Sequence, residues 1–278
     1  MSAYLYVVAT PIGNLDDISP RAVQILRTVD LIAAEDTRHA ARLMDHYHIT
    51  TALTACHDHN ENHKITEIIY KIKQGQSVAL VSDAGTPLIS DPGFKLVRAA
   101  HEEQIRVVPI PGACAAIAAL SAAGLASDRF SFEGFLPAKS HARQQKLQAL
   151  KTATQTLIFY EAPHRILDCA QDMHDIFGAD RHVTMAREIT KTFETIKKTT
   201  FAELVDWVKN DPNQQKGEIV LVVAGAPDVG EQDQQKIDDL LKRLLQDLPV
   251  KTASQLAADL TGLKKNELYQ RALQLKAL

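Results

Sequence analysis

The sequence predicts an α/β fold made of two α/β domains, followed by a small helical extension. Short β-branched runs alternate with helical patterns as far as Ile110, and a second cycle of strands and helices begins near Phe130. After Gly225 no strand-like run follows, and apolar residues recur at helical spacing. We therefore expect domains over residues 1–115 and 116–226, and a helix-turn-helix-like extension over residues 232–278.

In the first half, helical patterns lie between short apolar runs. Ser19 and Pro20 supply an N-cap and a first-turn proline, and apolar residues follow them at helical spacing. A second amphipathic helix is expected over residues 60–74, and a third from about residue 91. This alternation favours a mostly parallel sheet covered by helices. The expected strands are residues 4–9, 31–34, 77–81 and 106–110.

The second half contains further strand-like runs, and the extension contains three helical patterns. Residues 192–198 alternate in polarity, as an exposed or antiparallel strand would. In the extension, Thr252 is the expected N-cap of the second helix, and Gly262 is expected to end it. The other expected strands are residues 157–160, 183–186 and 219–224, and the expected helices are 238–247, 252–262 and 265–275.

The composition is that of an ordinary globular protein. Hydrophobic residues make up 45% of the 278 residues and charged residues 23%. The net charge of −3 excludes a uniformly basic nucleic-acid coat but leaves room for a local basic patch. The three cysteines lack a CxxC pair and predict neither a disulfide framework nor a zinc site. The longest apolar run, residues 113–123, is too short to span a bilayer, so we expect a cytoplasmic protein without a membrane partner.

Three loops have the character of ligand-binding loops. Residues 81–93, 9–14 and 109–116 each follow a predicted strand and are rich in glycine, proline and small residues. The carboxyl ends of parallel strands meet at one edge of a sheet, so we expect these loops to converge on one pocket. Neither a GxGxxG nor a GxxxxGK[ST] pattern is present. The loops therefore suit a nucleoside-sized ligand with a carboxylate better than a polyphosphate.

Polar clusters lie beside these loops. Residues 35–38 follow a buried strand, so they form either part of a site or a solvated helix start. Residues 56–63 suggest a metal site, but converging ligands for a full coordination shell are not evident, and a polar rim is the alternative. Residues 134–160 contain no acidic residue. At helical spacing Lys139, Arg143 and Lys146 would share one face, which is either a phosphate-binding stripe or a solvated surface.

Seven motifs together carry a family resemblance. They are ATPIGNLDDI at residues 9–18, EDTR at 35–38, HDHNE at 57–61, VSDAGTPLISDPG at 81–93, PGACAAIAALSAAGL at 111–125, FYEAPHR at 159–165 and AREITK at 186–191. Over about residues 3–225 the chain resembles the ribosomal RNA small subunit methyltransferase I family, within the wider group of tetrapyrrole methylases and diphthine synthases. The helical tail resembles the C-terminal helix-turn-helix extension of that family.

The resemblance implies an S-adenosylmethionine-dependent enzyme that methylates the ribose 2′-hydroxyl of a cytidine in 16S rRNA of the small ribosomal subunit, near the decoding centre. It also implies a homodimer whose subunits hold the cofactor between their two α/β domains. The implied cofactor contacts are Pro11, Asp83, Gly85, Thr86, Ile89, Ala115, Ala116, Tyr160, Ala186, Ala224 and Gly225.

Methylation of a ribose hydroxyl requires a group that removes the hydroxyl proton, because this hydroxyl is a poor nucleophile. The candidate bases are Asp36, Glu35 and His57, and Glu161 is an alternative from the second domain. Arg38 and Asn60 are expected to orient phosphate or ribose in the same catalytic group. The expected RNA contacts are Lys139, Arg143, Lys146 and Arg165.

Three other functions remain open at this point. A methylase of a tetrapyrrole or another small molecule would need no basic stripe outside the cleft. A metal-dependent hydrolase would use His57, His59, His63 and Asp83. A non-enzymatic RNA-binding module would be centred on the terminal helices.

Overall fold

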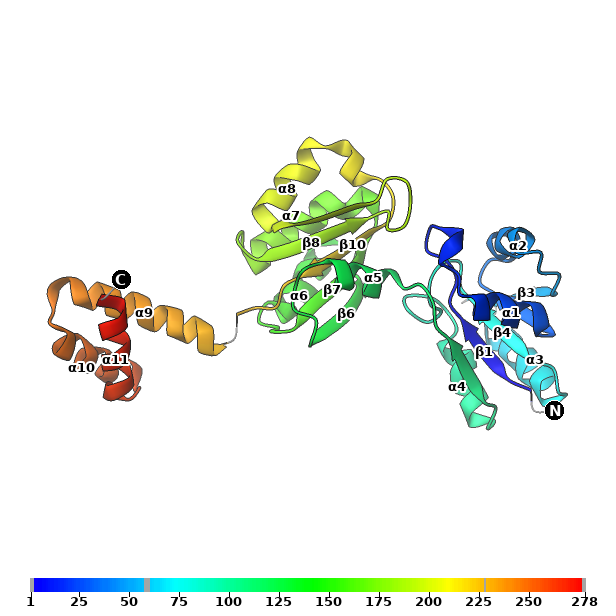
Figure 1. Cartoon of the computed structure of the whole chain (residues 1–278), viewed down its shortest axis with the longest axis horizontal. Helices are drawn as coiled ribbons and strands as arrows, with labels where there is room; N and C mark the ends of the chain where they lie inside the picture. Colours follow the sequence, from blue (N-terminus) through cyan, green and yellow to red (C-terminus); the bar gives the residue numbers. More distant parts are fainter. Residues whose placement is uncertain (1–2, 58–60, 228, 277–278) are drawn as a thin grey trace. The chain divides into compact units, whose positions relative to one another are not determined.

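The computed structural model describes residues 3–57, 61–227 and 229–276, with only the backbone described at residues 61–63 and 229–234 (Figure 1). The chain forms two compact units. The first contains the residues up to Lys151 together with Gln155–Ala224, and the second contains Thr152–Thr154 with Gly225–Leu278. Both sheets belong to the first unit, and the expected extension falls within the second. Of the helices described here, none has the length and apolar character needed to cross a membrane.

The first sheet is parallel and has the strand order β3-β2-β4-β1-β5. Its strands are β1 (Leu5–Val8), β2 (Leu31–Ala34), β3 (Leu53–Ala55), β4 (Val78–Val81) and β5 (Val107–Ile110). The connecting segments form η1 (Leu15–Asp17), α1 (Pro20–Thr28), α2 (Thr37–His46), α3 (Glu61–Lys73) and α4 (Phe94–Glu102). The parallel sheet predicted from the alternation of strands and helices is confirmed, although β3 carries only three residues and was not predicted.

Alternation along the strands divides the apolar core into two layers. Ala79 and Val81 of β4 pack with Leu26 of α1 and Met44 of α2 on one face. Val78 and Leu80 of β4 pack on the other face with residues of α3 and α4, including Ile68 and Leu96. A strand that is buried on both faces reads as a continuous apolar run, which is the pattern of β4. The carboxyl edge of this sheet carries the loops that lead to the site.

The second sheet is mixed and has the strand order β6-β7-β10-β8-β9. Its strands are β6 (Phe130–Phe135), β7 (Thr156–Glu161), β8 (His182–Arg187), β9 (Thr195–Thr200) and β10 (Ile219–Val223). Only β6 and β7 pair in parallel, whereas β10 lies antiparallel between β7 and β8. The antiparallel strand predicted near residues 192–198 is confirmed as β9. The helices are α5 (Ala115–Ala122), α6 (Ser140–Leu150), η2 (Pro163–Arg165), α7 (Ile166–Phe177), α8 (Phe201–Asn210) and η3 (Pro212–Gln215).

Helix α5 follows the last strand of the first sheet but packs on the second sheet. Ala116, Ala119 and Leu120 are buried against Ile158 of β7 and Val220 of β10. The small side chains let the helix lie close to the strands. The segment before α5 therefore connects the two sheets, and the start of α5 lies where the sheets face the same cavity.

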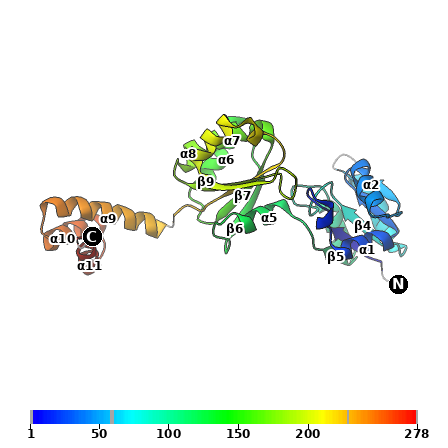
Figure 2. The same cartoon turned by 45° about the horizontal axis from the view of Figure 1, so that its top comes forward.

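The second compact unit is a three-helix cluster of α9 (Val229–Asp247), α10 (Val250–Thr261) and α11 (Lys265–Lys276) (Figure 2). Its core is formed by Leu241, Ala257, Leu268 and Ala272. Three helices were predicted here, but the prediction that Thr252 caps the second one was wrong. Helix α10 begins directly after Pro249, whose carbonyl accepts from the Thr252 N–H, so Thr252 lies inside the first turn.

We expect Gly262→Ala to destabilise the second unit by about 1–2 kcal/mol, because Gly262 ends α10 with a left-handed φ of +72°. The position that the alanine Cβ would take has no neighbouring atom within 4 Å, so strain of the backbone is the expected cause rather than a steric clash. Urea unfolding followed by the helical signal would measure the change. Gly262→Asn should lose less stability, and equal stability of all three proteins would contradict the assignment.

Candidate active site

A cavity of about 390 Å³ lies between the two sheets of the first compact unit. Loops after the strands of the first sheet form one wall, and the ends of β6, β7 and β10 with the residues around them form the other. This volume suits a ligand of small-molecule size. The lining residues are Ile12, Glu35, Asp83, Ala84, Gly85, Thr86, Ile89, Ser90, Asp91, Cys114 and Ala115 on the first side, and Phe135, Tyr160, Glu161, Ala162, Pro163, Ile189, Glu218, Ile219 and Val220 on the second.

The loop at residues 82–93 has an unusual backbone. Gly85 and Gly93 have φ angles of +85° and +122°, and the non-glycine residues Leu88 and Ser90 also have positive values, +75° and +67°. Left-handed backbone at non-glycine residues costs about 1–3 kcal/mol each and occurs most often at functional sites. The strain therefore supports the prediction that this loop binds a ligand.

Two backbone hydrogen bonds fix the start of this loop against the first strand. Thr10 N donates to Gly85 O at 2.8 Å, and Gly85 N donates to Thr10 O at 3.1 Å. A side chain at Gly85 would lie 3.3 Å from Ile12 Cγ2 in addition to requiring the positive φ. The loops after β1 and β4 are thus joined at their bases, so the convergence predicted from the sequence is confirmed for this pair.

Carboxylates dominate the polar part of the lining. Glu35, Asp83, Asp91, Glu161 and Glu218 all face the cavity. Burial raises the pKa of Asp91, and the charge of the nearby Asp83 adds to this shift. Such a lining attracts a cationic ligand and repels a polyphosphate.

Glu161 and Glu218 each form an ion pair with a basic side chain. Glu161 lies 3.2 Å from Arg165 Nε and also accepts from Ala162 N. Glu218 forms an ion pair of 2.8 Å with Lys191. Part of the negative charge on the side of the second sheet is therefore balanced within the chain.

Tyr160 forms an aromatic wall of the cavity. Its ring makes edge contacts with Phe132 and Phe135, at centroid distances of 4.9 and 5.7 Å. Its hydroxyl accepts a hydrogen bond from Ala116 N, at 3.1 Å, in the first turn of α5. Burial raises the pKa of Tyr160 well above its ordinary value, so the hydroxyl stays protonated at neutral pH. One N–H in the first turn of α5 is thus already hydrogen-bonded to a side chain.

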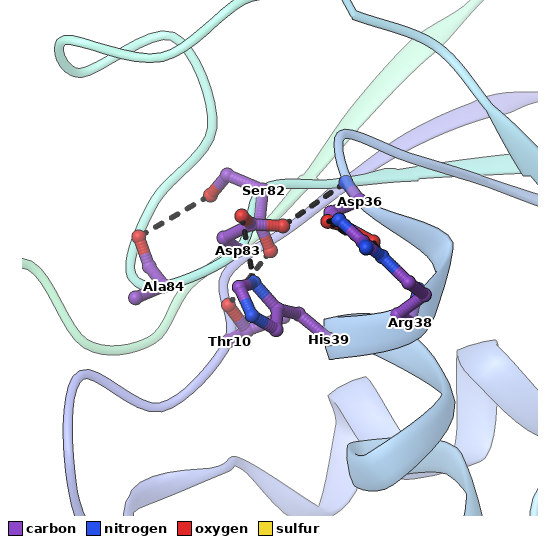
Figure 3. Close-up of polar contacts among 7 residues, drawn as sticks. All are labelled: Thr10, Asp36, Arg38, His39, Ser82, Asp83 and Ala84. Carbon is purple, nitrogen blue, oxygen red and sulfur yellow. Dashed lines mark hydrogen bonds and ion pairs between the residues drawn. The ribbon is translucent and has the colours of Figure 1, made fainter.

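A polar cluster of Asp36, Arg38, His39 and Asp83 forms at the carboxyl ends of β2 and β4 (Figure 3). Asp36 N donates to Asp83 Oδ1, and His39 Nδ1 lies 3.0 Å from Asp83 Oδ2. Asp36 caps α2 by accepting from Arg38 N, and its carboxylate pairs with the Arg38 guanidinium at 2.6 Å. These hydrogen bonds hold the pKa of Asp36 well below its usual range.

About half of the predicted catalytic and cofactor-binding residues meet at the cavity. Those that line it are Glu35, Asp83, Gly85, Thr86, Ile89, Ala115, Tyr160 and the alternative base Glu161. The other residues of these two groups that the structure describes are not part of the lining; they are Pro11, Asp36, Arg38, His57, Ala116, Ala186, Ala224 and Gly225. Asn60 lies outside the described residues.

Ala186 and Ala224 have specific reasons for lying away from the cavity. Ala186 is fully buried in the core between α5 and the second sheet. Ala224 follows the end of β10, whereas the cavity is lined by Glu218–Val220 at the other end of that strand. Ala224 lies four positions beyond Val220 along the extended chain, which is about 13 Å. Gly225 belongs to the second compact unit.

Sequence reasoning missed several lining residues. Asp91 was available inside the motif at residues 81–93 and was overlooked. No sequence pattern indicated that Phe135 and Glu218 line the cavity, because their position depends on the mixed topology of the second sheet. His39 is the residue directly after the EDTR motif, and only the fold shows its contact with Asp83.

The predicted basic stripe on α6 was wrong for Arg143. Its side chain is buried and forms an ion pair of 2.6 Å with Asp172 of α7. Ser140 and Gln144 also donate to this carboxylate, so the face that we expected to bind phosphate packs instead against α7. Lys139 remains exposed.

The other two predicted RNA contacts also bind groups of the chain itself. Lys146 Nζ donates to Glu133 O at 2.8 Å. Arg165 donates to Leu136 O at 2.6 Å and lies beside Glu161. The absence of acids within residues 134–160 did not reveal these pairs, because Glu133 and Glu161 directly flank that segment.

A metal site finds no support among the residues that the structure describes, since no three His, Cys, Asp or Glu side chains gather in a ligating arrangement there. His59 and the side chain of His63, which the metal interpretation also needs, lie outside the described part.

We expect Arg143→Ala to lower the free energy of unfolding by about 3–5 kcal/mol, because it leaves Asp172 buried without its ion-pair partner. The paired change Arg143→Met with Asp172→Leu should recover much of this loss, since it removes both buried charges. Denaturant unfolding measures the effect, and the exposed Lys139→Ala is the matched control. Unchanged stability of Arg143→Ala with weakened RNA binding would restore the original prediction.

Comparison with known families and proteins agrees with this geometry. Residues 4–205 match the family model of tetrapyrrole (corrin/porphyrin) methylases, and residues 231–276 match the RsmI C-terminal HTH domain. A ribosomal RNA small subunit methyltransferase I from Pseudomonas aeruginosa is 59% identical over 272 residues, which is 97% of this chain and 96% of the relative. One from Haemophilus influenzae is 54% identical over 275 residues, covering 98% of this chain and 97% of the relative.

Solved structures of similar fold have much lower identity. A diphthine synthase has a TM-score of 0.63 at 15% identity and covers 80% of this chain and 90% of its own. A cobalt precorrin-4 methyltransferase has a TM-score of 0.60 at 16% identity and covers 80% and 94%. These structures share the fold, and the high-identity relatives define the closer kinship.

Proposed function

The chain belongs to the ribosomal RNA small subunit methyltransferase I family, within the tetrapyrrole methylases, and on that basis we propose that it methylates the RNA of the small ribosomal subunit. We further propose that the methyl donor is S-adenosylmethionine and that the acceptor is the ribose 2′-hydroxyl of a cytidine in 16S rRNA. The observation that carries the proposal is the cavity between the two sheets, where the predicted loops converge on a carboxylate-rich lining.

The lining has the chemistry that S-adenosylmethionine requires. This cofactor has a positive sulfonium, a positive ammonium and one carboxylate, and when bound it supplies an activated methyl group. Glu35, Asp83 and Asp91 provide complementary negative charge. Apolar and aromatic residues, including Ile12 and Phe135, provide surface for a nucleoside. The residues present therefore fit this group.

Residues beside the cavity must orient the acceptor hydroxyl toward the methyl donor. A displacement at carbon requires the attacking oxygen to be held in line at close distance, which is mainly a positioning problem. Arg38, whose side chain is 86% exposed, belongs to the polar cluster at the carboxyl ends of β2 and β4 and pairs with Asp36. Its guanidinium can in addition donate a hydrogen bond to a phosphate of an RNA chain outside the cavity.

The predicted bases differ in their suitability for proton removal. Asp36 is a weak base because its lowered pKa makes its protonated form unstable. Glu161 is buried and already contacts Arg165 and Ala162 N. Glu35 lines the cavity and keeps its place as a candidate.

The homodimer and the cytoplasmic location inferred from the sequence stay predictions. The C-terminal match to a helix-turn-helix domain supports a role of the second unit in contacting the substrate RNA.

We expect Asp91→Asn to weaken S-adenosylmethionine binding by about 10- to 100-fold, because it removes a partly buried negative charge facing a cationic ligand. Isothermal calorimetry measures this, with Asp175→Asn on α7 as the control. Because the pKa of Asp91 is raised, this carboxylate becomes protonated at a higher pH than an ordinary aspartate. The affinity of the wild-type protein for S-adenosylmethionine should therefore fall as the pH is lowered, and Asp91→Asn should lose part of this pH dependence. Equal affinities of wild type and Asp91→Asn would remove Asp91 from the site.

The acceptor is tested by incubating the purified protein with labelled S-adenosylmethionine and small ribosomal subunits that lack the modification. Mass spectrometry of nuclease fragments should place the label on the ribose of one cytidine in 16S rRNA. Label on a base, or RNA without label, would contradict the proposed acceptor.

A further inference from the structure

We propose that His39 is the general base that removes the proton from the acceptor hydroxyl, and that Asp83 positions its imidazole. This inference deepens the proposed function and rests on it, since it assigns the proton of a ribose hydroxyl. His39 was not among the bases expected from the sequence. Its contact with Asp83 in the structure identifies it as a candidate.

The His39–Asp83 pair has a fixed geometry. His39 is the third residue of α2, and its Nδ1 lies 3.0 Å from Asp83 Oδ2 (Figure 3). The other oxygen of this carboxylate accepts from Asp36 N at 3.0 Å. Both oxygens of Asp83 are therefore held, one by the backbone at the start of α2 and one by the imidazole. A carboxylate fixed in this way fixes the orientation of the ring in turn.

The contact with Asp83 selects one tautomer of the imidazole. An ionised carboxylate only accepts hydrogen bonds, so the hydrogen between the two groups belongs to His39 Nδ1. In the neutral imidazole the lone pair is then on Nε2, the nitrogen that faces away from Asp83. A nitrogen with a lone pair is what a general base requires.

His39 is also accessible to a large substrate. Its side chain is 55% exposed, so a macromolecule can reach it. Its partner Asp83 lines the cavity, as does Glu35, which precedes α2 by two residues. The imidazole thus contacts a residue of the cavity wall but is itself outside the lining and exposed to solvent.

The charged groups near the ring are Asp83 from the loop after β4, which contacts it, and Asp36 and Arg38 from the start of α2 (Figure 3). Arg38 is paired with Asp36 at 2.6 Å, so its charge is largely balanced. The carboxylate of Asp83 then stabilises the imidazolium as it forms.

Atoms and charges balance in the proposed step. The hydroxyl oxygen forms a bond to the methyl carbon while the carbon–sulfur bond breaks and its electron pair stays on sulfur. The hydroxyl proton passes to Nε2 of His39, and the imidazolium later releases this proton to water. Asp83 keeps its negative charge throughout, and the step requires no oxidant or reductant.

The pair is tested first without catalysis, by nitrogen-15 NMR of the histidine side chains in the full-length protein. The His39 signals are assigned by their loss in His39→Gln. At a pH where the ring is neutral, we expect the tautomer with hydrogen on Nδ1, and in Asp83→Asn a shift toward the tautomer with hydrogen on Nε2. A wild-type ring with hydrogen on Nε2 would overturn the proposal.

Single-turnover methylation of small ribosomal subunits is the second test. Glutamine can still donate to Asp83, so His39→Gln should keep the fold and bind S-adenosylmethionine within about threefold of wild type by calorimetry. Its methylation rate should fall by about 10²–10⁴-fold. The wild-type rate should decrease as the pH is lowered and the imidazole is protonated, and His39→Gln should lack this decrease. The matched control His46→Gln changes an exposed histidine in the last turn of the same helix.

Two outcomes separate this inference from the proposed function. If the wild-type protein labels ribose and His39→Gln has a similar rate and an unchanged pH profile, only the role of His39 is overturned. In that case we expect Glu35→Gln to lose activity. A wild-type protein that labels no RNA would contradict the proposed function, and the NMR tautomer would still decide whether the pair exists.

Discussion

The pairing of β2 with β4 in the parallel first sheet is the constraint on which the candidate site depends. Ala34 and Val81 lie opposite each other at the last paired positions of these strands. The residues that follow them, Glu35 and Asp36 on one side and Ser82 and Asp83 on the other, therefore emerge side by side. Neighbouring parallel strands necessarily place their carboxyl ends together, so acidic groups far apart in the sequence form one cluster.

The pairing of β2 with β4 positions the site only if the loop after β4, residues 82–93, is held in place. The reciprocal hydrogen bonds between Thr10 and Gly85 join the loops after β1 and β4, and left-handed backbone at Leu88 and Ser90 is held by the surrounding structure. The strain shows that the fold gives up stability to keep this path, which is common where a ligand must be met by a preformed surface. Because β1 lies between β4 and β5, the same edge continues toward the start of α5 and the second sheet.

The sequence predicted those parts of the fold and site that depend on local pattern. Glu35 and the loop at residues 81–93 were singled out because each follows a buried strand in an alternating β-α pattern, and the family resemblance implied Asp83 and Gly85 within that loop. Arg143 was misjudged because helical spacing shows which residues share a face but not which face is packed against a neighbour. Glu218 could not be found, since it precedes a strand that runs antiparallel to its neighbours, and only that topology brings it to the cavity.

The negative charge of the cavity lining affects the two proposed ligands, RNA and the methyl donor, in different ways. A lining rich in carboxylates repels the phosphates of RNA, so under the proposed function the polynucleotide backbone would stay outside the cavity while one nucleotide approaches. The same carboxylates would hold the proposed donor, S-adenosylmethionine, more strongly than the neutral thioether that remains after transfer, because the sulfonium charge is lost in the reaction. The acidic lining therefore favours both the binding of the donor and the release of its product. An overall charge of −3 is compatible with this lining, because the net charge averages over the whole chain whereas the acidic residues of the lining are gathered at one cavity.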